Sequence, residues 1–218
     1  MAALQSGHCV VVGLDEAGRG TWAGPVAAGA VALSSDSLGR LAALDGVRDS
    51  KMLTPRAREE LEPRIVNAAL AVGFGLASAA EIDAIGILPA TRLAMRRAVA
   101  ALSLQVDFLL IDAVRLPQVH ISQKSIVKGD ALCLSVAASS IVAKVRRDRL
   151  MAELDAMYPG YGFARHKGYG TARHWASLQA LGPCPIHRRT FAPIRGYFTA
   201  ENAEGAEKTN GLSPRSLR

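Results

Sequence analysis

The chain has 218 residues, half of them hydrophobic, which is enough apolar surface for one buried core of ordinary domain size. No apolar stretch approaches the roughly 20 residues of a membrane-spanning helix, and no basic segment precedes the first apolar run. Three widely spaced cysteines do not make a disulfide framework. These features argue against membrane and secreted proteins, and with a formal charge of +7 they predict a globular cytoplasmic protein.

The first predicted strand ends in two acidic residues. The apolar run from Cys9 to Leu14 is followed by Asp15-Glu16-Ala17-Gly18-Arg19-Gly20. A carboxylate at the end of a core strand is costly to bury unless a cation or hydrogen-bond donors compensate it, so two adjacent ones indicate a metal ion. The glycines let the backbone approach a phosphate or sugar closely. The alternative is a polar turn with both acids solvated.

Three further apolar, β-branched runs are predicted to form strands: Pro25 to Leu33, Ala69 to Leu76 and Asp107 to Ile111. The last one, like the first strand, stops at an acid, Asp112. If these two strands are parallel neighbours, Asp15 and Asp112 meet at one edge of the sheet, where α/β proteins usually bind their ligands. Their repulsion would raise the pKa of one carboxyl group unless a divalent cation kept both ionised.

Helical patterns alternate with the later strands. One helix should begin with Thr54 as its N-cap and Pro55 as its first residue, and Pro63 should end or kink it. A second helix is predicted from Pro89 to about Leu104, and the longest from about Asp130 to Met151. Strands that come first in pairs and then alternate with helices indicate an α/β domain with a mixed sheet.

Composition divides the chain into a core of residues 1–156, a smaller helix-and-loop element at 157–198, and a tail at 199–218 that we expect to be disordered. Between residues 156 and 200 there are basic residues and no acidic one. A surface with only positive charges favours a polyanionic partner; the alternative is that these residues only keep the protein soluble. The basic residues are Arg165, Lys167, Arg173, Arg188, Arg189 and Arg195.

A third acid, Asp130, lies where the longest helix should begin, so it is either a metal ligand or an N-cap. Oxygen ligands without a neighbouring His or Cys set favour Mg²⁺ or Mn²⁺ over zinc. The isolated pair Cys184 and His187 is not expected to bind zinc. Several carboxylates around such ions are typical of two-metal phosphoryl transfer, and a basic surface would hold the nucleic acid that is cut.

Several motifs occur in one order between residues 9 and 198 and together resemble the ribonuclease HII family. They are Gly13 to Gly20, Ala23 to Val26, Asp49 to Lys51, Leu110 to Asp112, Ile126 to Ala131, Ala143 to Asp148 and His166 to Thr171. The resemblance implies a ribonuclease H-like fold, with a mixed β-sheet flanked by helices and a small C-terminal helical element.

The resemblance also implies a metal-dependent endonuclease. Its substrates would be the RNA strand of RNA–DNA hybrids and single ribonucleotides embedded in duplex DNA, which it would nick on their 5′ side. The products would carry 3′-hydroxyl and 5′-phosphate ends, and the cofactor would be Mg²⁺ or Mn²⁺. The residues that match the four active-site carboxylates of the family are Asp15, Glu16, Asp112 and Asp130.

Other motif residues match substrate contacts of the family. Gly18, Arg19 and Gly20 match the loop that senses the ribose 2′-hydroxyl, the group that distinguishes RNA from DNA. Tyr169 matches an aromatic that packs on the next sugar, a deoxyribose; without the resemblance, a lone Tyr would be interpreted as local core. Basic residues are predicted to contact phosphates, and the alternative for each is a solvated base. They are Lys51, Lys128, Lys144, Arg146 and Lys167.

Two other functions stay open. Another two-metal nuclease of the same fold would cut all-DNA substrates as readily, and a non-catalytic RNA- or hybrid-binding module would bind tightly without turnover. The acids count against the second, because without metal they repel phosphate. We expect a monomer and no membrane contact, and the sequence leaves open whether the tail at 199–218 binds a replication partner. His166 is expected to be an exposed loop residue and Asp148 to balance nearby charge.

Overall fold

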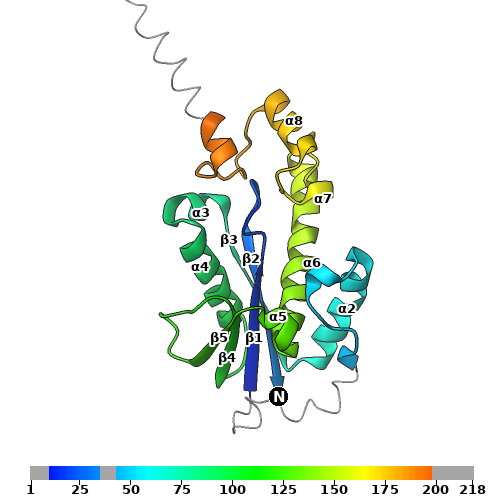
Figure 1. Ribbon diagram of the computed structural model, residues 1–218, viewed down its shortest axis with the longest axis vertical. Coiled ribbons are helices and arrows are strands. Elements are labelled where there is room, and N and C mark those ends of the chain that lie inside the picture. Colours follow the sequence, from blue (N-terminus) through cyan, green and yellow to red (C-terminus); the bar gives the residue numbers. More distant parts are fainter. Residues whose placement is uncertain (1–9, 35–42, 198–218) are drawn as a thin grey trace, which may run out of the picture.

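Five strands pair into one sheet in the order β3-β2-β1-β4-β5 (Figure 1). The computed structural model describes residues 10–34 and 43–197, so the predicted tail at 199–218 lies outside the described residues. β1 pairs with β2, and β2 with β3, in antiparallel fashion, whereas β1 with β4 and β4 with β5 are parallel. The mixed sheet is therefore confirmed. The strands are β1 Val10–Ala17, β2 Val26–Ser34, β3 Ala71–Ala77, β4 Phe108–Asp112 and β5 Ser122–Ile126.

Helices cover both faces of the sheet, with α3 and α4 on one face and α2 and α6 on the other (Figure 1). Residues 192–197 are also helical. No helix in the described part of the chain combines the length and the apolar character needed to cross a bilayer. The helices are η2 Ser50–Met52, α2 Pro55–Ala68, α3 Ala79–Ile85, α4 Ile87–Ala100, α5 Gly129–Leu132, α6 Leu134–Met157, α7 Phe163–His166 and α8 Ala172–Leu181.

Strand β1 supplies apolar side chains to both layers of the core, because successive residues of a strand point to opposite faces. Val12 and Leu14 belong to the cluster that includes Met95 of α4. Val11 belongs to the cluster that includes Val136 of α6. Both layers thus meet at the strand that carries the first acidic pair.

Helix α6 lies directly against the sheet at two glycines. A Cβ at Gly13 would lie 2.1 Å from the carbonyl carbon of Ser135, and one at Gly29 would lie 2.4 Å from the carbonyl oxygen of Ser139. Any side chain at these strand positions would therefore push the helix backbone away. The two glycines therefore let the backbone of α6 approach β1 and β2 closely.

The first predicted helix continues further than expected. Thr54 is its N-cap, as predicted, but the helix runs through Pro63 to Ala68. Leu61 and Ile65 are buried on the same helix. Their burial in the core compensates for the backbone hydrogen bond that a proline removes, since tertiary packing supplies most helical stability.

The predicted longest helix is in fact two helices. Asp130 is the second residue of α5, whose N-cap is Lys128 with φ 58°, and Cys133 separates α5 from α6. Asp130 is therefore not an N-cap. Strand β5 was missed because it is a polar, largely exposed edge strand. Helix α3 was also missed, although its capping box of Ser78 and Glu81 is a usable sequence signal.

We expect Gly13→Ala to lower the free energy of unfolding by about 2 kcal/mol, because overpacking a rigid interface typically costs about 1–3 kcal/mol. Urea unfolding measures this change. Gly20→Ala is the matched control, since a Cβ there meets nothing within 4 Å. Equal stability of wild type and Gly13→Ala would contradict the close approach of α6 to β1.

Candidate active site

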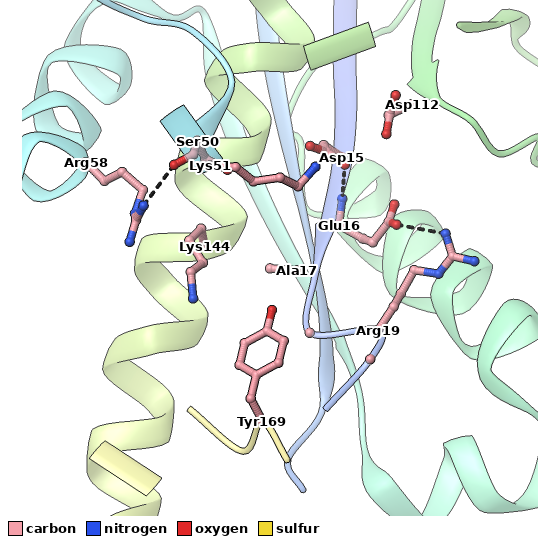
Figure 2. A pocket seen from close by; sticks show the side chains of 12 residues that line it. Asp15, Glu16, Ala17, Arg19, Ser50, Lys51, Arg58, Asp112, Lys144 and Tyr169 are labelled. Atoms are coloured by element: carbon pink, nitrogen blue, oxygen red, sulfur yellow. Dashed lines mark hydrogen bonds and ion pairs between the residues drawn. The ribbon is translucent and has the colours of Figure 1, made fainter. Parts of the chain in front are cut away.

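Three of the four predicted carboxylates line one cavity of about 230 Å³ at the carboxyl ends of β1 and β4 (Figure 2). They are Asp15, Glu16 and Asp112. The predicted Gly18 to Gly20 loop and Tyr169 form other parts of the wall. The remaining lining residues are Ala17, Ser50, Lys51, Arg58 and Lys144.

The register of the parallel strands brings the acids together. Leu14 of β1 pairs with Ile111 of β4, so the next residues, Asp15 and Asp112, lie at equivalent positions on the same face. The N–H of Gly129 donates to Asp112 Oδ1 at 2.8 Å, which ties the start of α5 to the end of β4. This hydrogen bond brings α5, with its buried Asp130, beside the same strand ends.

Lys51 approaches the carboxylates from η2. Its Nζ lies 3.3 Å from Asp130 Oδ2. Asp49 accepts from the N–H of Lys51 at 2.9 Å, and Arg58 donates to the carbonyl of Ser50 at 2.8 Å, so the short turn is held at both sides. Sequence reasoning missed Arg58 and Ser50. No motif marks Arg58, but its place one turn into a helix that follows the motif of Lys51 was a signal.

Glu16 is held by the arginine of the loop. Arg19 Nη1 lies 3.0 Å from Glu16 Oε1, and the ion pair is drawn in Figure 2. The other oxygen, Oε2, is buried and has no hydrogen-bond partner within the described residues. Burial raises the pKa of Glu16, although the hydrogen bond and charge of Arg19 oppose the shift.

Asp15 carries the strongest electrostatic conflict among these carboxyl groups. Burial raises its pKa well above the usual value, and the charges of Glu16, Asp112 and Asp130 raise it further, against a hydrogen bond from the N–H of Glu16. A cation would relieve this repulsion. An all-oxygen donor set with one unpaired buried oxygen fits Mg²⁺ or Mn²⁺.

The four carboxylates are not closed around a single point. Within residues 10–34 and 43–197, no three His, Cys, Asp or Glu side chains are already gathered as a set of metal ligands.

Basic and aromatic side chains continue the site toward the C-terminal element. Lys144 Nζ lies 5.8 Å from the centroid of the Tyr169 ring and 2.7 Å from Asp148 Oδ1. Lys144 and Tyr169, together with Arg58 and Lys167, line a second cavity of about 450 Å³. Tyr169 is 43% exposed, so it is not part of the core. The ion pair of Asp148 agrees with its expected role in charge balance.

Two predicted phosphate contacts, Arg146 and Lys128, line neither of these two cavities. Arg146 Nε is 3.0 Å from Glu62 Oε1, in an ion pair between α6 and α2. Lys128 adopts a left-handed backbone conformation before α5 and does not line the cavity. The structure thus brings Lys51 and Lys144 to the carboxylates and Lys167 to the adjoining cavity, but it does not bring Arg146 or Lys128 there.

The expectation that His166 is an exposed loop residue is wrong. It is 8% exposed, its ring stacks on His174 with 4.4 Å between centroids, and its Nδ1 accepts from the N–H of Gly168 at 3.2 Å. His174 Nε2 lies 3.0 Å from His187 Nε2, and His187 Nδ1 lies 3.1 Å from Cys184 Sγ. The aromatic packing of the C-terminal element, which the sequence does not reveal, covers the ring of His166.

The sheet order, the flanking helices and the acids at the ends of β1 and β4 define an α/β protein of the ribonuclease H-like fold class. Two solved structures share this fold. Ribonuclease H2 from Pyrococcus horikoshii OT3 has a TM-score of 0.74 and 28% sequence identity, with 88% of this chain and 99% of that chain covered. RNase HII from Archaeoglobus fulgidus, solved in a complex with PCNA, has a TM-score of 0.68 and 27% identity, with 85% and 96% covered.

The sequence comparisons specify the family. The family model described as Ribonuclease HII matches residues 12–194. A relative from Dehalococcoides mccartyi, named Ribonuclease HII, is 54% identical over 194 residues, which are 89% of this chain and 91% of the relative. The chain belongs to the ribonuclease HII family and is an endoribonuclease with ribonuclease H activity. The resemblance inferred from the motifs is confirmed, and a non-catalytic binding module is set aside.

We expect Asp15→Asn to raise the free energy of unfolding at pH 7 in the absence of divalent ions. Because the pKa of Asp15 is raised in the folded state, its ionisation removes stability as the pH rises above the ordinary value of 3.8. Asparagine removes that charge and keeps the oxygen that accepts from the N–H of Glu16.

Urea unfolding at several pH values tests this expectation, and the difference between variant and wild type should shrink toward pH 4. Asp45→Asn is the control, because Asp45 is exposed and outside the cavity. A destabilised Asp15→Asn protein at pH 7 would show that the carboxylate is compensated within the metal-free fold.

Proposed function

We propose that this ribonuclease H holds Mg²⁺ or Mn²⁺ with four carboxylates and cuts the RNA strand of RNA–DNA hybrids, as well as the 5′ side of single ribonucleotides embedded in duplex DNA. The proposed ligands are Asp15, Glu16, Asp112 and Asp130. The observation that carries the proposal is the common cavity: acids, a glycine-rich loop and an exposed tyrosine line the same space. Acids alone would repel a nucleic acid, and the loop and tyrosine supply groups that fit its sugars.

Hydrolysis needs a water molecule to add to phosphorus while the P–O3′ bond breaks, which leaves 3′-hydroxyl and 5′-phosphate ends. Divalent ions, when bound, activate that water and stabilise the departing oxygen. The chain holds the acids in place through Gly129 at Asp112 and Arg19 at Glu16. Lys51 and Lys144 are proposed to neutralise phosphates at the first cavity, and Lys167 at the second.

Sugar recognition is proposed for the Gly18 to Gly20 loop. Gly20 has space for a Cβ and no positive φ, so the fold itself does not require glycine there. The N–H groups of Arg19 and Gly20 have no acceptor among the described residues. A ribose 2′-hydroxyl can accept such a hydrogen bond, and a deoxyribose cannot. Tyr169 is proposed to pack on the neighbouring deoxyribose.

Lys128 and Arg146 are proposed to contact phosphates outside the two cavities. Action as a monomer in the cytoplasm is also proposed, and the free thiols of Cys133 and Cys184 are compatible with a reducing compartment. The relative from Archaeoglobus fulgidus was solved with PCNA, which supports a search for a replication partner of this chain.

We expect Asp112→Asn to reduce nicking of a duplex with one embedded ribonucleotide by about 100-fold or more with Mg²⁺ present, because it removes one anionic metal ligand. Gel analysis of end-labelled strands measures the rate. Asp45→Asn is the control and should cut at the wild-type rate. Undiminished cleavage by Asp112→Asn, or wild-type cleavage without divalent ions, would refute the metal site.

We expect Gly20→Ala to fold with wild-type stability but to cut the single-ribonucleotide duplex about 10-fold more slowly, because the new methyl group occupies space reserved for the sugar. Steady-state kinetics and urea unfolding give the two values. If the wild-type enzyme cut an all-DNA duplex equally well, the alternative of a general two-metal nuclease would replace ribose recognition.

A further inference from the structure

Two arginines are completely buried beneath the loop that faces the proposed sugar site. Arg147 lies on α6, and Arg188 lies in the C-terminal element; each is 0% exposed. Neither makes an ion pair within the part of the chain that the structure describes. A buried guanidinium without a carboxylate is costly, so its donors must be satisfied in another way.

Arg188 donates only to backbone carbonyls of the loop. Its Nη2 lies 2.6 Å from the carbonyl oxygen of Gly18, and its Nη1 lies 2.8 Å from that of Arg19. Its Nε lies 3.0 Å from the carbonyl oxygen of Gly24. One guanidinium group therefore holds both ends of the segment 18–24.

Arg147, on α6, donates further hydrogen bonds to the same segment of the chain. Its Nε donates to the carbonyl of Pro25 at 2.9 Å and its Nη2 to that of Ala23 at 3.3 Å. The Nη2 also donates to Thr21 Oγ1 at 3.0 Å, and the Nη1 donates to the carbonyl of Lys167 at 3.0 Å. The carbonyls of the loop are thus turned inward, toward the two guanidinium groups.

The glycine at the start of the loop is required by this packing. Gly18 has φ +88°, and a Cβ there would lie 2.0 Å from Arg147 Nε. Thr21 Oγ1 donates to the carbonyl of Gly18 at 3.1 Å, which links the loop to the donors of Arg147. The carbonyls of this segment accept hydrogen bonds from the two buried arginines, whereas the N–H groups of the exposed Arg19 and Gly20 have no acceptor among the described residues.

Both arginines keep their charge at neutral pH. Burial lowers the pKa of Arg147 to about 10 and that of Arg188 to about 9, and the charge of Arg147 contributes to the second shift. Two positive charges therefore lie behind the backbone that is proposed to meet a polyanion. Carbonyl dipoles, rather than carboxylates, stabilise them, so their charge is not cancelled.

We propose that Arg147 and Arg188 are positioning residues for ribose recognition. Their hydrogen bonds to backbone carbonyls fix the segment 18–25 and thereby direct the N–H groups of Arg19 and Gly20 at the 2′-hydroxyl of the substrate. This inference rests on the proposed function, in which that loop recognises ribose. The two arginines do not touch substrate.

The test compares full-length wild type with Arg188→Lys, Arg147→Lys and Thr21→Val. Lysine keeps the charge but loses the planar fork, and valine removes the hydroxyl link to Gly18 at similar volume. For each protein, kcat/KM is measured on a duplex with one ribonucleotide, and the inhibition constant is measured for the identical all-deoxy duplex as a competitor. The melting temperature is recorded alongside. Arg97→Lys, in an exposed ion pair with Glu81, is the control.

We expect kcat/KM of the two arginine variants to fall by about 10-fold or more, with an unchanged inhibition constant for the all-deoxy duplex and wild-type values for Arg97→Lys. Thr21→Val should show the same pattern with a smaller loss. Arg188→Ala removes the guanidinium group from the full-length protein, and added ethylguanidinium should restore part of the kcat/KM that this variant loses. That rescue would not follow from a general loss of stability.

Wild-type kcat/KM in all three folded variants would overturn the proposal, and so would a parallel weakening of all-deoxy binding. If the lysine variants do not fold, kcat/KM of Thr21→Val is the deciding measurement. If the wild type cuts the ribonucleotide duplex no faster than the all-deoxy duplex, it is the proposed function, and not the role of the two arginines, that is refuted. Amide hydrogen exchange at Trp22 and Gly24 then tests whether the two arginines fix the segment 18–25, and it should be faster in Arg188→Lys than in Arg97→Lys.

Discussion

The site depends on the parallel pairing of β1 with β4. Because Leu14 and Ile111 are paired, both strands deliver their terminal acids to one edge and one face of the sheet. A slip of one residue would turn one of the two acids to the opposite face. The close packing of α6 on Gly13 supports this register by fixing the helix against the strand. The electrostatic repulsion at Asp15 is the direct result, and it makes the cavity suited to a cation.

Much of this arrangement could be predicted from the sequence because it is encoded locally. Apolar runs that stop at Asp15 and Asp112 identified two strands and the edge where they meet, and the motifs identified the family. The prediction at Pro63 failed because burial of neighbouring apolar residues outweighs the local effect of proline. The break in the helix after Asp130 lies at Cys133, whose extended backbone separates α5 from α6, and no residue type in this stretch marks it in the sequence.

Other parts of the site have no local signature. Arg146 and Arg147 are adjacent in sequence, yet Arg146 forms a partly buried ion pair with Glu62, whereas Arg147 is fully buried and forms no ion pair within the described residues. Helical geometry separates them, and only the tertiary fold shows which of them faces the loop. His166 was misassigned for a similar reason, since the rings that pack on it are those of Phe163, at the start of its own helix α7, and of His174 in α8.

The loop that faces the proposed sugar site is shaped by a residue about 170 positions later in the chain, since Arg188 holds the carbonyls of Gly18 and Arg19. Such a contact forms only after Arg188 has left the ribosome, whereas all five strands of the sheet lie before residue 127. The sheet and its acids can therefore assemble on the nascent chain before the loop acquires its final shape.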